Sequence, residues 1–454
     1  MRIFNVCYFY KILKTVEKGF IIKKKALEDD MKKLKVILIG AGDRGMRYTN
    51  IMKDMPEMYE VVAVAEPLEN RRVFVKEKHS IPDDMCFLDW RPLLEKGKIA
   101  DLCLICTMDR DHYDPAMKAI ELGYDIMLEK PMAPTQEQCT ALAHAAEKKG
   151  VKVIICTVLR YSDVFVALKN IIDSGKVGRV MSVNHEECVG FIHQSHSFVR
   201  GNWGNVGRSS NMLLQKSCHD IDILQWLLSK KCKKVQSFGT LSYFTEENAP
   251  KGAPEYCYMG CPEGEKCPFN AVKLYYDDKE NGWFRGAATK HVYHTDEMVW
   301  KAITETQYGK CVYHCDNDVV DHQTVNMLFE DNVTVTFTMN AFNQGGRHIH
   351  IMGTEGEIRA ALDSGSPISV YSHRTKTSEE FDITGTDGVT GGHGGGDEGI
   401  VATVYEYLNG AYTGKSIPEI EESYYNHSIV FAAEKSREEN TVVDFESYFE
   451  EVNK

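Results

Sequence analysis

A basic residue, an imidazole and a carboxylate stand close together in one helix-like segment, residues 211–227 (NMLLQKSCHDIDILQWL). At helical spacing, Lys216 lies three residues before His219 and four before Asp220, so the three side chains share one side of the helix. An imidazole can accept or donate a proton near neutral pH, and a charged neighbour tunes that exchange. A solvated helix face would carry the same residues, so the segment alone leaves both interpretations open.

A glycine-rich turn follows a strongly apolar run in VILIGAGDRGMRY. Gly40 permits a tight turn, Gly42 lets a pyrophosphate approach the backbone, and Gly45 lets the following helix pack closely on the strand. Asp43 and Arg44 lie at the expected N-terminus of that helix, where free N–H groups favour phosphate. These five residues are candidates for binding a dinucleotide, and an ordinary strand–helix turn is the alternative.

Glu66 ends the next apolar run, VVAVAE, about twenty residues after the last glycine, the position from which an acid accepts the ribose hydroxyls. A carboxylate there repels the 2′-phosphate of NADP, so the pattern favours NAD. Arg71 and Arg72 follow closely and could turn toward that phosphate, which keeps NADP as the less favoured cofactor.

The stretch from Thr107 to the MLEKPMAP segment resembles the Gfo/Idh/MocA family of NAD(P)-dependent oxidoreductases, and the resemblance continues to GTEGEI, residues 353–358. It implies that Thr107, His112 and Glu129 lie around the cofactor. It also implies that Lys130, which precedes a proline, sits at the nicotinamide beside the substrate hydroxyl. A surface lysine that closes a strand is the plain alternative.

Hydride transfer from a carbinol carbon requires a group that removes the hydroxyl proton. Lys130, placed in a pocket beside a cationic nicotinamide, would have a lowered pKa and could do this. The family's substrate-domain helix usually carries an aspartate and, four residues later, a histidine. Here His219 matches the histidine, but Gln215 replaces the aspartate and cannot charge-stabilise an imidazolium. We predict Lys130 and His219 as the catalytic residues.

Two further polar clusters suit a polyhydroxylated ligand, because they combine hydrogen-bond donors with an aromatic face. They lie in GFIHQSHSFVRGNW and in GGHGGGDEG, and ordinary polar loops are the alternative for each. The predicted substrate-binding residues are Arg160, His193, His196, Arg200, Trp203, Lys216, Asp220, His393 and Asp397.

Cysteines cluster in EYCYMGCPEGEKCPF, which contains Cys257, Cys261 and Cys267, with Cys311 following in a distant segment. Three closely spaced thiols and one distant thiol could form a tetrahedral structural zinc site. The spacing is not that of a standard zinc ribbon, so free buried cysteines or a disulfide remain alternatives.

The elements that would position these residues fall into two groups. From residue 35, short apolar runs alternate with helix-like pieces, which predicts a doubly wound parallel sheet of the Rossmann type. After about residue 160 the strands become longer and partly alternating, which predicts an α+β domain with a large open, mostly antiparallel sheet. We expect an N-terminal extension over 1–33, an NAD-binding domain over 34–159, and a substrate-binding and oligomerisation domain over 160–454.

The chain's 454 residues and formal net charge of -13 are typical of a two-domain protein with neither a nucleic-acid partner nor an anionic-membrane partner. Lysines interrupt the N-terminal apolar residues too often for a membrane span, and MKKLKVILIGAG at Met31 looks like a natural start. The fourteen cysteines are scattered through apolar runs, which favours a reducing, cytoplasmic setting. The family resemblance implies a homodimer or homotetramer.

Together these features predict an NAD-dependent dehydrogenase that acts on a secondary hydroxyl of a sugar, glycoside or polyol. A redox-neutral glycosidase or lyase, which would use NAD to form a transient keto-sugar, is the alternative. A catalytically silent NAD-binding or regulatory protein is a third possibility, which the presence of both Lys130 and His219 disfavours.

Overall fold

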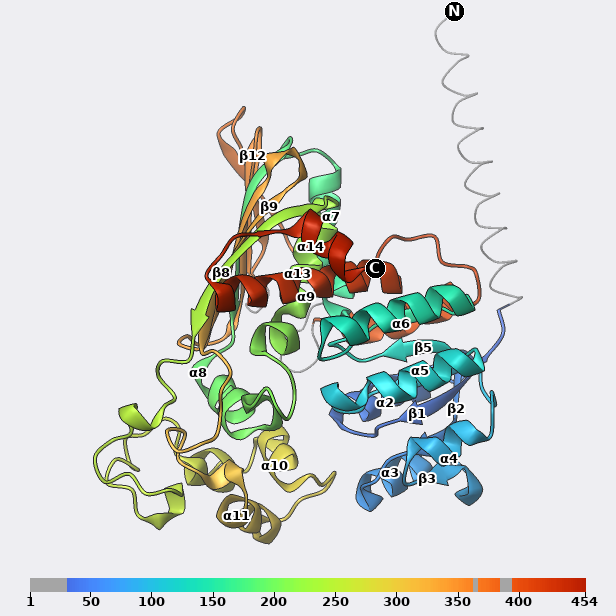
Figure 1. The fold of residues 1–454 in the computed structure, drawn as a ribbon, viewed down its shortest axis with the longest axis vertical. Coiled ribbons are helices and arrows are strands. Elements are labelled where there is room, and N and C mark those ends of the chain that lie inside the picture. The colour runs from blue at the N-terminus through green and yellow to red at the C-terminus, as the bar shows by residue number, and fades with distance from the viewer. Residues whose placement is uncertain (1–30, 362–365, 384–393) are drawn as a thin grey trace, which may run out of the picture.

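The computed structural model describes residues 31–361, 366–383 and 394–454. Its first domain is built on a six-stranded parallel sheet with strand order β3-β2-β1-β4-β5-β6 (Figure 1). The strands are nearly continuous runs of buried apolar residues because helices cover both faces of the sheet. Their bounds are β1 Leu34–Ile39, β2 Tyr59–Ala65, β3 Cys86–Phe87, β4 Leu102–Ile105, β5 Asp125–Leu128 and β6 Val153–Ile155.

The helices of this domain begin and end where the sequence provides caps. The Thr135 side chain accepts a hydrogen bond from the Gln138 N–H at the start of α6, and Gly123 and Gly150 end α5 and α6 in the left-handed conformation. The helices are α2 Asp43–Asp54, α3 Glu69–His79, α4 Trp90–Glu95, α5 Tyr113–Leu122 and α6 Gln136–Lys149.

The second domain contains a nine-stranded sheet with strand order β14-β13-β12-β11-β7-β10-β9-β8-β15. Among the strand pairs that the structure describes in this sheet, only β7 and β10 are parallel, so the predicted mostly antiparallel sheet and the predicted fold class are confirmed. The strands are β7 Val180–Cys188, β8 Cys232–Thr240, β9 His322–Phe329, β10 Thr334–Asn340, β11 Gly346–Gly353, β12 Gly356–Ala361, β13 Ile368–Ser372, β14 Thr377–Phe381 and β15 Val443–Asp444.

One face of the large sheet carries the core of the second domain. Burial alternates residue by residue along β9, as expected when one face is packed and the other open. The helices α7 Asp163–Asp173, α9 Met212–Leu228 and α13 Ile420–Glu439 contribute to the apolar core on the packed face. In Figure 1, α9 lies between the large sheet and the parallel sheet.

A small lobe extends from the second domain at the lower left of Figure 1. It contains α8 Phe191–His193, α10 Gly282–Thr289 and α11 Asp296–Glu305, with wide helical turns over 194–200 and 272–277 and two small apolar cores. The lobe also contacts α3 of the first domain, where the Asn70 side chain accepts a hydrogen bond from the Val292 N–H at 3.2 Å.

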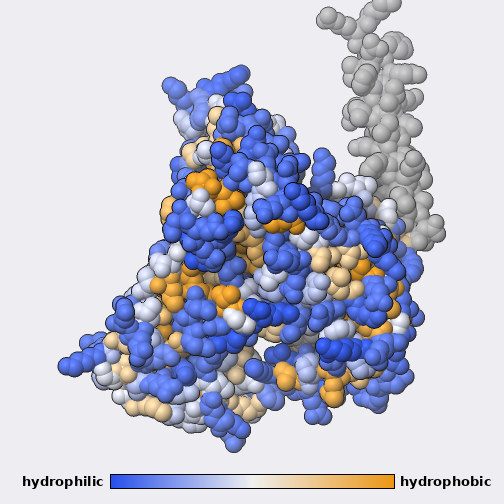
Figure 2. Space-filling view, viewed as in Figure 1, coloured by the Kyte–Doolittle hydropathy of each residue, from blue (hydrophilic) through white to orange (hydrophobic). Residues whose placement is uncertain are grey.

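The C-terminal segment packs against both domains. The helix α12 Gly396–Leu408 places Ile400 and Val404 in the apolar core of the first domain, whereas α14 Phe445–Val452 packs beside β8. Figure 2 shows a mostly hydrophilic face that is hollowed between the first domain and the small lobe. Within the described ranges, none of the helices is both long and apolar enough to span a membrane.

Candidate active site

Lys130 stands at the carboxyl end of β5 and reaches out of the first domain. Its Nζ donates a hydrogen bond to the Gln215 carbonyl oxygen at 2.7 Å, on the first turn of α9. The peptide bond between Lys130 and Pro131 is cis, and the Pro131 carbonyl oxygen lies 2.7 Å from Nδ1 of His112. Lys130 is therefore placed at the junction of the two domains by contacts on both sides.

Glu129 anchors the same turn from inside the first domain. Its Oε1 accepts hydrogen bonds from Arg44 Nε and Tyr48 Oη, both at 2.8 Å. Burial opposes the charge on Glu129, but Arg44 and Lys130 outweigh it and hold the pKa of the carboxyl below its ordinary value. Glu129 is therefore a buried carboxylate that fixes the lysine-bearing turn.

The glycine-rich turn has the shape that a bound pyrophosphate requires. A Cβ on Gly40, where φ is +90°, would lie 2.6 Å from the Cys106 carbonyl oxygen, and a Cβ on Gly45 would lie 2.1 Å from the Gly40 carbonyl oxygen. A Cβ on Gly42 would approach nothing closer than Arg71 Nη1 at 3.8 Å, so this glycine leaves room beside the backbone. Tight packing at the outer glycines and space at the middle one fit a dinucleotide.

Two polar side chains border this turn. Glu66 Oε2 accepts the Ala41 N–H at 2.7 Å, and its Oε1 accepts the Leu68 N–H at 2.9 Å, so the carboxylate lies directly beside the turn. Thr107 Oγ1 is buried and has no hydrogen-bond partner among the described residues. An unpaired buried hydroxyl next to the turn fits a site that is completed by a cofactor.

The two arginines after Glu66 differ in their contacts. Arg72 Nη1 donates to the Glu66 carbonyl oxygen at 2.7 Å, which places its charge at the end of β2. Arg71 lies above Gly42, and its Nε is buried without a hydrogen-bond partner in the described chain. The structure therefore places Arg71 nearer to the glycine turn than the sequence pattern alone could indicate.

His219 lies one helical turn after Gln215 on α9 and is 5% exposed. Side chains on a helix lean toward its N-terminus, so His219 leans toward the turn that Lys130 contacts. The same region of α9 carries Lys216. The predicted catalytic pair therefore approaches from two domains.

A network of ion pairs supports this part of α9. Lys216 Nζ lies 3.1 Å from Glu187 Oε1, and Glu187 Oε2 lies 2.5 Å from Arg347 Nη2. Arg347 Nε also donates to Asp220 at 2.8 Å, and Asp220 lies 2.8 Å from His185 Nε2. Burial opposes the charge on Asp220, but Arg347 and His185 hold the pKa of its carboxyl well below the ordinary value.

Cationic groups surround His193. Burial, followed by Lys216 and the neighbouring groups His196 and Arg347, lowers the pKa of His193 well below its ordinary value. Burial also lowers the pKa of Lys216, although Glu187 opposes that effect. His193 is thus a neutral imidazole in a positively charged surrounding.

Several predicted substrate-binding residues have other contacts. Arg160 is fully buried and pairs with Asp222 at 2.7 Å and with Glu422 at 2.9 Å. Asp397 is also fully buried, and its carboxylate pairs with Arg44 at 2.6 Å and Arg47 at 2.5 Å. The pairs of Arg160 lie within the second domain, whereas those of Asp397 tie α12 to α2 of the first domain. The described contacts of both residues are therefore structural ion pairs and do not include Lys130.

The predicted polar loop before residue 204 is helical and mostly buried. His196 stacks on Phe284 with ring centroids 4.0 Å apart and lies 2.8 Å from the Tyr275 hydroxyl, inside the small lobe. Trp203 Nε1 donates to Asp109 at 3.4 Å. His393 lies outside the described residues.

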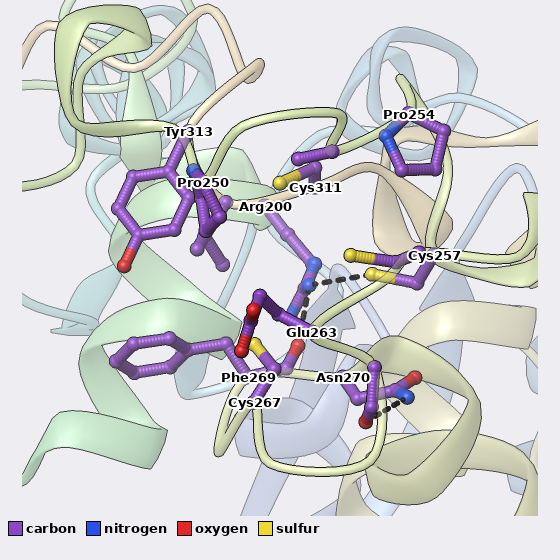
Figure 3. A pocket seen from close by; sticks show the side chains of 14 residues that line it. Arg200, Pro250, Pro254, Cys257, Glu263, Cys267, Phe269, Asn270, Cys311 and Tyr313 are labelled. Atoms are coloured by element: carbon purple, nitrogen blue, oxygen red, sulfur yellow. Dashed lines mark hydrogen bonds between the residues drawn. The ribbon is translucent and has the colours of Figure 1, made fainter.

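The zinc prediction is not supported. Cys257, Cys261, Cys267 and Cys311 do line one small cavity, but Arg200 extends into the same cavity (Figure 3). Arg200 Nη2 donates to Cys257 Sγ at 3.6 Å and to the Phe269 carbonyl oxygen at 2.7 Å. Over the described ranges, His, Cys, Asp and Glu side chains form no group of three or more that could hold a metal ion. The predicted tetrahedral arrangement is therefore absent there, and Arg200 lies among the cysteines rather than with the substrate candidates.

Four residues beside the site were missed from the sequence: Asp109, His185, Glu187 and Arg347. A period of two from Val183 places His185 and Glu187 on the buried face of β7, which was a usable signal for functional polar groups. Arg347 could not be found this way, because its pairing with Glu187 depends on the register between β7 and β11. Asp109 accepts hydrogen bonds from the hydroxyls of Ser209 and Ser210, an arrangement that only the fold reveals.

Family models match both parts of the chain. Residues 34–157 match the model GFO_IDH_MocA, described as an oxidoreductase family with an NAD-binding Rossmann fold. Residues 169–445 match GFO_IDH_MocA_C, described as the C-terminal alpha/beta domain of the same oxidoreductase family.

Individual relatives are distant. The Bacillus subtilis protein YteT, an oxidoreductase by name, is 25% identical over 311 residues, which cover 65% of this chain and 70% of YteT. Inositol 2-dehydrogenase of Salmonella typhimurium is 27% identical over 206 residues, 45% of this chain and 57% of that enzyme. The 2,7-anhydro-N-acetylneuraminate hydratase of Mediterraneibacter gnavus is 23% identical, with 46% of this chain and 53% of the hydratase covered. The chain thus aligns with little more than half the length of the latter two relatives.

A solved structure shares the whole fold. Levoglucosan dehydrogenase in complex with NADH and L-sorbose superposes with a TM-score of 0.67 at 16% identity, covering 91% of this chain and 99% of that one. At this identity the similarity shows the fold alone.

Proposed function

This chain belongs to the Gfo/Idh/MocA family of NAD-binding oxidoreductases, and from that membership we propose that it transfers a hydride between a nicotinamide cofactor and a secondary hydroxyl of a sugar, glycoside or polyol. The hydrogen bond from Lys130 to the Gln215 carbonyl oxygen carries the proposal. It places an amine from the cofactor-binding domain against the helix that bears His219.

The mechanism divides between the two domains. Bound NAD supplies the hydride acceptor, and Gly40, Gly42, Gly45 and Glu66 would hold it. Lys130 would take the proton of the substrate hydroxyl as hydride leaves its carbon, with His219 as the second acceptor or as the anchor of a neighbouring hydroxyl. Glu129 and His112 would act as positioning residues, because both fix the turn that carries Lys130.

NAD is the cofactor we propose over NADP. Glu66 places a carboxylate beside the glycine turn, where it would accept ribose hydroxyls and repel a 2′-phosphate. Arg71 lies close to the same turn. If the protein preferred NADP, Arg71 would be the residue that binds the 2′-phosphate. Measured affinities for both cofactors separate the two cases.

Carbohydrates are the proposed substrates because relatives that share the fold act on them. The names of inositol 2-dehydrogenase and levoglucosan dehydrogenase specify a polyol and an anhydrosugar. Lys216, next to the residue that Lys130 contacts, pairs with Glu187 of β7, and such hydrogen-bonding groups suit a ligand rich in hydroxyls.

The test is to incubate the protein with NAD or NADP and a panel of sugars, glycosides and polyols, following reduced cofactor and product together. Production of NADH in proportion to oxidised sugar supports the proposal. The proposal would be contradicted if no member of the panel were turned over and if Lys130→Met bound the same ligands with the same affinity as the unaltered protein.

A redox-neutral lyase or glycosidase is a second candidate, favoured by the hydratase among the relatives and by Gln215 at the position where the family usually has an aspartate. In this case the hydride returns to the sugar after elimination of the leaving group. The same panel distinguishes the two functions, because cleavage without net NADH identifies the second.

We also propose a cytoplasmic homodimer or homotetramer. The open face of the large sheet exposes polar side chains from neighbouring strands, including Glu186, His348 and Arg359, which line a shallow depression. Pairing of this face between subunits would cover it. Light scattering after size-exclusion chromatography tests the assembly, and a monomer at micromolar concentration would contradict it.

A further inference from the structure

Lys216 is an ammonium group that lies mostly inside the protein, with its side chain 18% exposed. Among the described residues, its one ion-pair partner is Glu187, at 3.1 Å. An ammonium has three N–H donors, so this single contact leaves further donors available. Burial lowers the pKa of Lys216, consistent with a charge that its surroundings only partly compensate.

The carboxylates nearby are shared rather than reserved for Lys216. Glu187 also pairs with Arg347 at 2.5 Å, and Asp220 pairs with Arg347 and contacts His185. Lys130 donates to a backbone carbonyl and makes no ion pair within the described part of the chain. Lys216 and Arg347 therefore share two carboxylates on this side of α9, and Lys130 pairs with neither of them.

Lys216 lies next to the contact between the two domains, so its incompletely compensated charge is relevant to ligand binding. Lys216 immediately follows Gln215, whose carbonyl oxygen is the acceptor for Lys130. His193, at the start of the small lobe, lies close enough to Lys216 for the charge of that lysine to lower the pKa of its imidazole. A group that reaches Lys130 with a hydroxyl would therefore approach Lys216 with a neighbouring substituent.

We propose that the substrate is an acidic sugar, and that Lys216 is the specificity-determining residue that binds its carboxylate. This inference rests on the proposed function. A carboxylate would give the ammonium a second anionic acceptor, and charge-assisted hydrogen bonds of this kind are strong in a partly desolvated site. A neutral sugar offers only hydroxyl oxygens and leaves the charge imbalance in place.

A carboxylate fits better than a phosphate. Phosphate groups are commonly recognised by the planar fork of an arginine, and the fork of Arg347 already contacts Glu187 and Asp220. The remaining donors belong to Lys216, whose single charge one carboxylate neutralises, whereas a phosphate carries about −1.5 to −2 and would leave negative charge uncompensated.

The experiment uses the full chain saturated with NADH and matched ligand pairs: D-glucuronate with D-glucose, and D-galacturonate with D-galactose. Ligand affinity is measured by thermal shift and calorimetry, independently of turnover. We expect the acid of at least one pair to bind about ten- to a hundredfold more tightly than its neutral partner. Substitution Lys216→Met should abolish the difference, whereas Lys216→Arg should retain part of it.

Lys216→Met is expected to fold, because Glu187 keeps its ion pair with Arg347. Lys118→Met, at an exposed lysine of α5, is the matched control and should leave the preference unchanged. The inference is overturned if no acid binds more tightly than its neutral partner, or if Lys216→Met weakens both members of a pair equally. Oxidation of neutral sugars with no preference for acids would overturn the inference and preserve the proposed function. Preferential binding of an acid without turnover of any sugar would preserve the inference about Lys216 and contradict the proposed function.

Discussion

The Nζ of Lys130 and the carbonyl oxygen of Gln215 lie 2.7 Å apart and join the two domains at the candidate active site. The contact uses a backbone acceptor, so it does not depend on the identity of the side chain at position 215. Gln215, in place of the aspartate that the family resemblance implies, is therefore compatible with this lysine contact.

Replacing Lys130 by methionine should remove the proton acceptor without disturbing the glycine turn. We expect the turnover number on an accepted sugar to fall by about a hundredfold to ten-thousandfold, the range typical of lost acid–base catalysis. NADH affinity, measured by fluorescence titration, should change little. The control Lys118→Met should behave as the unaltered protein; equal activity of the Lys130 variant would show that another group takes the proton.

Replacing Glu66 by alanine should weaken NAD binding by about tenfold or more, because hydrogen bonds to a charged acceptor are lost. Binding of NADP should weaken less or improve, since the repulsive carboxylate is gone and Arg71 remains nearby. Both dissociation constants are measurable by calorimetry. Glu69→Ala, on the first turn of α3, is the control. An equal loss of affinity for NAD and for NADP would argue against recognition of the ribose hydroxyls by Glu66.

Arg160 should be essential for stability rather than for substrate binding. Its replacement by methionine leaves Asp222 as a buried carboxylate without its cation, which costs about 3–5 kcal/mol. Urea unfolding measures this loss, and the double variant Arg160→Met with Asp222→Leu should recover part of it. Lys435→Ala, which breaks an exposed pair, should cost less than about 1 kcal/mol. An Arg160 variant that is as stable as the unaltered protein but inactive would instead indicate that Arg160 binds substrate.

Acid should destabilise the protein through buried neutral histidines. Burial, followed by the charge of Arg200, lowers the pKa of His196 to about 3, whereas the unfolded chain takes up the proton near 6.5. The stabilising contribution is therefore complete above pH 6.5 and is lost as pH falls toward 3, by about 2 kcal/mol between pH 7 and pH 5.

The variant His196→Phe should flatten this pH dependence, since it keeps an aromatic ring against Phe284 and removes the titration. Urea unfolding at both pH values gives the comparison, with exposed His144→Gln as the control. An unchanged slope would mean that His196 is not the group that titrates.

The parallel sheet and the glycine turn could be predicted because local patterns determine them. Continuous apolar runs mark buried strands, and the spacing of Gly40, Gly42 and Gly45 has one physical explanation in that context. The large sheet was predicted from alternation of apolar and polar residues, which marks strands with one packed face. In β9, Val325 and Met327 lie on the packed face and Thr324 and Asn326 on the open face.

The environment of the site could not be predicted from the sequence, because it depends on pairings between distant segments. Arg347 meets Glu187 through the register of two strands, and Asp397 meets Arg44 because α12 returns to pack beside α2. A charged residue in a sequence looks the same whether it binds a ligand or closes an ion pair. For Arg160 and Asp397, only the fold reveals the ion pairs.

The buried pair of Arg160 and Asp222 also constrains how this protein can diverge. Loss of either residue alone leaves an uncompensated charge inside the protein, whereas loss of both can be nearly neutral once apolar side chains fill the space. Because two different residues must change, a single substitution passes through a protein with an uncompensated buried charge. Descendants of this chain should therefore keep the pair intact or exchange both members together.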